Sequence, residues 1–153
     1  MGFPQKEWLV YFYEAKDHHW SLRFFKKNFK HCGVIGYFNE MDTWMLQEYV
    51  YGKLMVELLT KKDIESLFLF IKNTNGKIVK VPVKETEKSP LPNLFGAWLK
   101  EHSCTSYVQR LLGLNHFLIF SPHQLFCALK RKGFNEIKLL LWEYLNQNPL
   151  LVI

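Results

Sequence analysis

The sequence contains little cysteine and no long apolar run. Its 153 residues include three cysteines without a close pairing pattern, which argues against a disulfide framework and favours free thiols in a reducing compartment. No apolar stretch approaches the length that crosses a bilayer, and the first residues lack the basic and apolar regions of a signal peptide. We therefore expect a chain that is cytoplasmic as synthesised, has no signal peptide and has no membrane span.

Several functional motifs are also absent. The sequence has no Gly-rich phosphate loop and no Ser-His-Asp motif, and its histidines and cysteines do not follow a metal-ligand spacing. We therefore expect no cofactor and no metal, and interpret Cys32 and Cys127 as core residues. The net charge is +6. We interpret the basic residues as a solvated surface and rank nucleic-acid binding last, because net charge says little about specific function.

What is present is enough apolar material for one folded domain. Apolar residues make up 48% of the chain and aromatic residues 16%, which allows a substantial core. The pattern predicts an α+β fold, in which an antiparallel sheet of about four to five strands packs against a cysteine-bearing helix. Strands are expected near residues 8–13, 29–38, 43–50, 53–58 and 77–83, and helices over 61–72, 104–112, 121–131 and 135–147.

Cys104 is the residue with the clearest chemical potential. It follows Ser103 at the start of a short amphipathic helix that Gly113 closes. A thiol at a helix N-terminus is exposed to the positive end of the helix dipole, which favours the nucleophilic thiolate. The alternative interpretation is a small apolar core residue that packs with Val108 and Leu111.

His31 begins a strand-like run and is the candidate partner of Cys104. In an antiparallel hairpin that turns over residues 39–42, opposite positions sum to about 80 to 81. This places His31 near Tyr49, with Gln47 and Glu48 close by. Either side chain can orient an imidazole, but strand alternation lets only one of them face the His31 side, and the register stays open.

Three segments together resemble a known family. They are Phe-Lys-His-Cys-Gly-Val-Ile-Gly-Tyr at 29–37, Cys-Thr-Ser-Tyr-Val at 104–108 and Ser-Pro-His-Gln-Leu at 121–125. Their order is similar to the permuted papain-like fold, in which NlpC/P60-type and lecithin retinol acyltransferase-like enzymes place the histidine strand before the cysteine helix. The resemblance covers about residues 29–129. Ser103 departs from it, because many relatives have Asn or Asp before the cysteine.

The resemblance implies a cysteine hydrolase or acyltransferase that acts on an amide or ester bond. Cys104 would be the nucleophile, His31 the general base, and Gln47 or Glu48 the polar third residue, which no motif identifies. The family context suggests a peptide or acyl substrate, with a peptidoglycan peptide of the cell wall first, and a phage or virion-associated protein. Such an enzyme would be a cysteine peptidase (thiol protease) or amidase.

The alternative is a non-catalytic structural or interaction subunit, for example virion-associated, that keeps a papain-like fold. Residues 1–153 are expected to form a single domain, with the papain-like core at 29–129 and a C-terminal helix and apolar tail at 135–153. One face of that helix and the tail are apolar and can complete the domain's own core or dock a protein partner. The helix face contains Ile137, Leu140, Leu141, Tyr144 and Leu145, and the tail ends in Leu150-Leu151-Val152-Ile153.

Overall fold

The described part of the chain folds around a five-stranded antiparallel sheet with the strand order β4-β3-β2-β1-β5. The computed structural model describes residues 7–15, 26–83, 103–114 and 119–137. Within these ranges the α+β class and the antiparallel sheet expected from the sequence are confirmed. The strands are β1 (Glu7–Tyr13), β2 (His31–Phe38), β3 (Thr43–Val50), β4 (Lys53–Leu59) and β5 (Lys77–Pro82), and the helices are α1 (Lys61–Asn73), α3 (Cys104–Leu111) and α4 (Pro122–Arg131).

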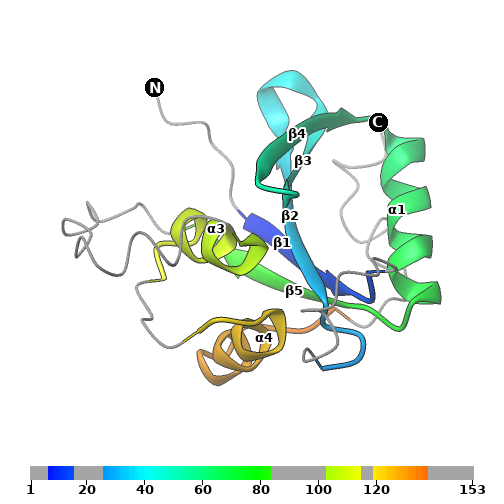
Figure 1. Ribbon diagram of the computed structural model, residues 1–153. Coiled ribbons are helices and arrows are strands. Elements are labelled where there is room, and N and C mark those ends of the chain that lie inside the picture. Colours follow the sequence, from blue (N-terminus) through cyan, green and yellow to red (C-terminus); the bar gives the residue numbers. More distant parts are fainter. Residues whose placement is uncertain (1–6, 16–25, 84–102, 115–118, 138–153) are drawn as a thin grey trace.

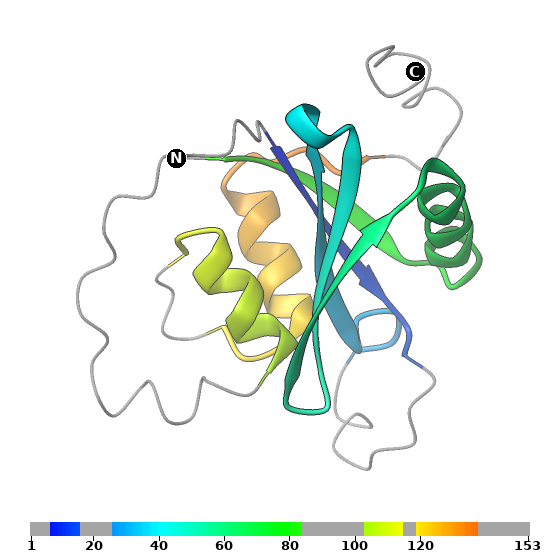
Figure 2. The ribbon, with the colours of Figure 1, turned by 90° about the horizontal axis from the view of Figure 1, so that it is seen from above.

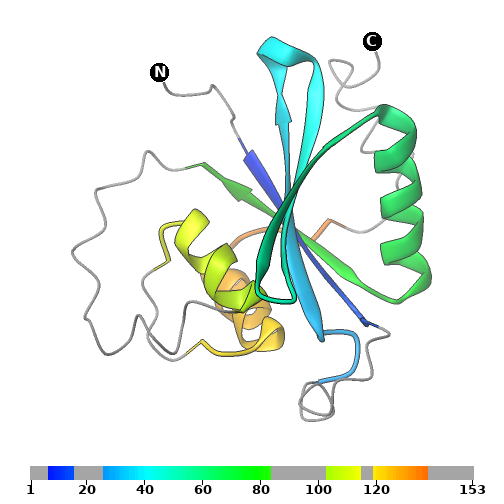
Figure 3. The same ribbon diagram turned by 45° about the horizontal axis from the view of Figure 1, so that its top comes forward.

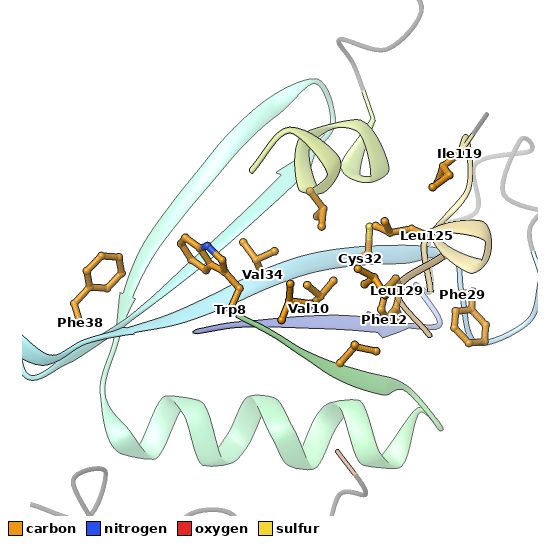
Figure 4. Packing of buried hydrophobic residues seen from close by; sticks show 13 residues of the cluster. Trp8, Val10, Phe12, Phe29, Cys32, Val34, Phe38, Ile119, Leu125 and Leu129 are labelled. Atoms are coloured by element: carbon orange, nitrogen blue, oxygen red, sulfur yellow. The ribbon is translucent and has the colours of Figure 1, made fainter. Parts of the chain in front are cut away.

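The helices cover both faces of the sheet. Helices α3 and α4 lie on one face and α1 lies on the other (Figures 1 and 2). Because successive side chains of a strand point to opposite faces, the sheet separates two apolar clusters. The cluster on the α3/α4 face includes Val10, Phe12, Cys32, Val34, Val108, Leu125 and Leu129 (Figure 4). The cluster on the α1 face includes Leu9, Tyr11, Ile35, Ile64, Phe68 and Ile71.

Each helix in the described ranges begins after a residue whose side chain caps it. Thr60 and Asp63 form a reciprocal capping box at α1, and Ser121 and Gln124 form another at α4. At α3 the side chain of Ser103 accepts a hydrogen bond from the third residue of the helix. These side chains satisfy backbone N–H groups that have no partner within the helix.

The register of β2 on β3 agrees with the predicted hairpin. Gly33 pairs with Glu48 and Val34 with Gln47, so opposite positions sum to 81. A 3-10 turn at Asn39–Met41 connects the two strands. The neighbours Gln47 and Glu48 consequently extend from opposite faces of the sheet.

The prediction of a helix over residues 135–147 is wrong at its start. The backbone N–H of Lys80 donates to the carbonyl of Asn135 over 3.0 Å, and that of Ile137 donates to Ile78 over 2.9 Å. This extended segment pairs with β5, whose outer edge would otherwise leave backbone groups without partners. Ile137 also packs against the cluster on the α1 face. The later residues of the predicted helix and the apolar tail lie outside the described residues.

Candidate active site

Cys104 is the first residue of α3, and polar contacts tie its helix to β3 and to the segment before α4. The hydroxyl of Tyr107 donates a hydrogen bond to the side-chain oxygen of Gln47 on β3. The buried side chain of Gln109 donates to the carbonyl of Ile119 over 2.8 Å. Cys104 itself is partly buried and packs against the cluster on the α3/α4 face. Cys104 therefore contributes to apolar packing, and its thiol is held at the N-terminus of a helix with a fixed position.

His31 is the first residue of β2, and its imidazole is largely buried. The side chain is 12% exposed, and its Nε2 lies 3.5 Å from Oε1 of Glu48. That distance indicates an ion pair and is too long for a good hydrogen bond; no described residue gives Nε2 a hydrogen bond of normal geometry. The ring of Tyr13 meets the imidazole edge to face, with centroids 5.3 Å apart. The ring is therefore packed in place beside a carboxylate.

Glu48 has a second partner, Tyr11, which the sequence analysis missed. The hydroxyl of Tyr11, a fully buried residue on β1, donates to Oε1 of Glu48. Gly33 makes room for this contact, because a Cβ at that position would lie 2.6 Å from Cζ of Tyr11 and 2.9 Å from Cγ of Glu48. Burial opposes ionisation of Glu48, but His31 and Tyr11 together lower the pKa of its carboxyl below the usual value.

The electrostatics of Cys104 and His31 favour an ion pair. The thiol of Cys32 and the imidazole of His31 together outweigh burial and hold the pKa of Cys104 well below its usual value. Burial lowers the basicity of His31, but the neighbouring Cys104 and Glu48 outweigh it and raise the pKa of His31 to about 9. Near neutral pH the two residues therefore favour thiolate and imidazolium.

Cys32 lies next to this pair although the sequence indicated only a core residue. It is fully buried, as expected, and lies on the α3/α4 face with Leu125 and Leu129 (Figure 4). Burial and the adjacent Cys104 raise the pKa of Cys32 well above its usual value. Cys32 therefore stays a neutral thiol, which can donate to a neighbouring thiolate.

A second cysteine and histidine lie close together on α4, but their surroundings differ. Sγ of Cys127 is 3.6 Å from Nε2 of His123, and Nζ of Lys26 is 3.0 Å from the same nitrogen. Burial and the Lys26 charge lower the pKa of His123, so this imidazole does not favour a thiolate partner. Cys127 is partly exposed, which corrects its assignment to the core.

The structure brings His31 into contact with both Cys104 and Glu48, and it turns Gln47 to the other face of the sheet from Glu48. Gln47 faces α3, where it binds Tyr107, because it is one residue out of phase with Glu48 on the strand. Tyr11 gave no signal in the sequence, because only the pairing of β1 with β2 places it beside Gly33. The remaining histidines His18, His19 and His102 lie outside the described residues.

Comparison with protein-family models, with curated proteins and with solved structures finds no match to this chain. Within the described ranges, no helix is long and apolar enough to cross a membrane, and no three His, Cys, Asp or Glu side chains group as metal ligands would.

Proposed function

We propose that this chain is a cysteine hydrolase or acyltransferase that acts on an amide or ester bond. Cys104 is the nucleophile, His31 carries the transferred proton, and Glu48 orients the imidazole. The observation that carries the proposal is that His31 on β2 interacts with two groups: Glu48 on β3, whose Oε1 lies 3.5 Å from its Nε2, and the thiol of Cys104 on α3, whose pKa the imidazole lowers. Nucleophilic catalysis requires this arrangement, in which a base lies beside the nucleophile and a third group orients the base.

In the proposed reaction the Cys104 thiolate attacks the substrate carbonyl carbon. The first backbone N–H groups of α3 have no acceptor within the helix, so those of Cys104 and Thr105 can donate to the developing oxyanion. When the tetrahedral intermediate collapses, the imidazolium of His31 protonates the leaving amine or alcohol, and a thioester remains on Cys104. Neutral His31 then takes a proton from water, hydroxide attacks the thioester, and the acid is released with the thiolate restored. An acceptor alcohol or amine in place of water gives acyl transfer.

The order of the elements supports a permuted papain-like arrangement, since the histidine on β2 precedes the cysteine on α3 along the chain. By that resemblance, the first substrate class to test is a peptidoglycan peptide, and a virion-associated setting is part of the same proposal. The noncatalytic alternative predicts the same fold with an unreactive Cys104.

The experiment that tests the proposal is alkylation by iodoacetamide, followed for each cysteine by mass spectrometry as a function of pH. Cys104 should react well below the usual thiol pKa, whereas buried Cys32 should react slowly. His31→Ala should move the Cys104 profile to higher pH. The matched control is His123→Ala, which removes the imidazole beside Cys127 and should leave the Cys104 profile unchanged.

A Cys104 that reacts with the pH profile of an ordinary thiol, both with and without His31, would contradict the proposal and favour the noncatalytic subunit. If the profile is as expected, turnover is measured on peptidoglycan peptides and on simple acyl esters. Cys104→Ala should abolish turnover while the circular dichroism spectrum stays that of the wild type. Turnover retained by this variant would exclude Cys104 as the nucleophile.

A further inference from the structure

Strand β4 is an edge of the sheet, and its side chains are unusually exposed. It lies at the end of the strand order, as Figure 3 shows, and six of its seven residues are exposed. Four of them are large and apolar: Leu54, Met55, Val56 and Leu58, with exposed fractions of 49%, 43%, 51% and 64%. Natural proteins usually protect an apolar edge strand of this kind by charge, proline or cover.

No other strand of the described ranges pairs with the outer backbone of β4. Tyr51 and Gly52 both have positive φ, 50° and 75°, as in the tight two-residue turn that closes a hairpin. In such a hairpin the flanking residues, here Val50 and Lys53, form a hydrogen-bonded pair, and the bonding direction then alternates along the strand. The backbone groups that point away from β3 therefore belong to Leu54, Val56 and Leu58.

The charged residues of β4 favour pairing with the β4 strand of a second copy, in one particular register. Lys53 and Glu57 are both exposed, and neither forms an ion pair with another described residue. In an antiparallel pair of two β4 strands centred on Met55, each Lys53 lies opposite the Glu57 of the other copy. That register also places the outward backbone groups of Leu54 opposite those of Val56, as a ladder requires.

The neighbouring registers are less favourable. Centring the pair on Val56 places Glu57 opposite Met55, and centring it on Glu57 brings two like charges together, which destabilises a strand pair. Among these three registers, only the one centred on Met55 pairs Lys53 with the Glu57 of the other copy. Because the interface has two-fold symmetry, this pair forms twice.

We propose that two copies of this chain associate through β4, by antiparallel pairing centred on Met55, so that one continuous sheet runs through both copies. The association uses neither Cys104 nor His31 and is independent of the proposed reaction. A short strand pair buries less surface than a stable interface of standard size, so the dimer should form in the micromolar range of concentration.

The test is sedimentation equilibrium over low to high micromolar concentrations, with a charge exchange across the interface. Lys53→Glu alone and Glu57→Lys alone each place like charges opposite each other twice and should weaken the dimer about tenfold. Combining both substitutions restores opposite charges and should restore the affinity. Lys130→Glu on α4 makes the same change in net charge as Lys53→Glu, away from β4, and should leave the affinity unchanged.

Hydrogen exchange of the backbone amides identifies what covers the edge. Protection of Leu54, Val56 and Leu58 that increases with protein concentration supports the pairing. Protection that is equal at all concentrations would mean that residues of the same chain, such as 138–153, cover β4, and it would overturn the proposal. A chain that stays monomeric at every concentration, or a dimer that the double exchange does not restore, would overturn it as well.

Discussion

Tyr11→Phe is the substitution that most directly tests the buried contact behind His31. Tyr11 is 0% exposed, and its hydroxyl donates to a Glu48 side chain that is 15% exposed. A hydrogen bond to a charged group contributes about 1.5–3 kcal/mol, and phenylalanine avoids the cost of burying a hydroxyl. We therefore expect the free energy of unfolding to decrease by about 2 kcal/mol, which lowers Tm by about 4–8 °C in a domain of this size.

The effect should also depend on pH, because the contact is made with a carboxylate. The pKa of Glu48 is below its usual 4.5 in the folded protein. The stabilisation by the ionised carboxyl is therefore present above pH 4.5 and is lost as the pH falls through the lower, folded-state pKa. The difference between wild type and Tyr11→Phe should be largest near neutral pH and should shrink in acid. Urea unfolding at several pH values measures it.

The matched control is Tyr37→Phe. The hydroxyl of Tyr37 also donates to a carboxylate, that of Asp42, but this pair is exposed to solvent. We expect its loss to change stability by less than about 0.5 kcal/mol. If Tyr11→Phe is no more destabilising than Tyr37→Phe, or its effect does not change with pH, the buried contact does not support Glu48.

Three further predictions concern single positions. Gly33→Ala places a Cβ 2.9 Å from Cγ of Glu48, so we expect a loss of about 1–3 kcal/mol in urea unfolding; wild-type stability would contradict this close packing. Thr60→Ala removes the capping box of α1 and should cost about 1 kcal/mol in the same assay, and a neutral result would show that the cap does not contribute. An NMR titration should show His31 with a pKa raised from 6.5 to about 9. The stabilisation by its positive charge is then complete below pH 6.5 and is lost as the pH rises through 9. In Cys104→Ala the pKa of His31 should fall, and an unchanged value would exclude an electrostatic interaction between the two residues.

Local sequence signals were sufficient for most of the fold. The caps Thr60 and Ser121 predict where α1 and α4 begin because their side chains satisfy backbone groups a few residues away. The hairpin of β2 and β3 could be aligned because its turn is short. Local signals gave a wrong prediction for the segment that begins at Asn135. Its helical periodicity is outweighed by hydrogen bonds to β5, a partner more than fifty residues earlier in the chain.

Some features of the candidate site were likewise predictable from the sequence, and others were not. The sequence by itself determined the chemical types: a thiol at a helix N-terminus, a histidine at a strand start, and two polar candidates on the next strand. Only the tertiary structure decided that Glu48 and not Gln47 faces His31, and that Tyr11 and Cys32 border the site. Helix starts and hairpin turns depend on neighbours in the chain, whereas these contacts depend on how β1 and α3 pack on the sheet, which no short stretch of sequence encodes.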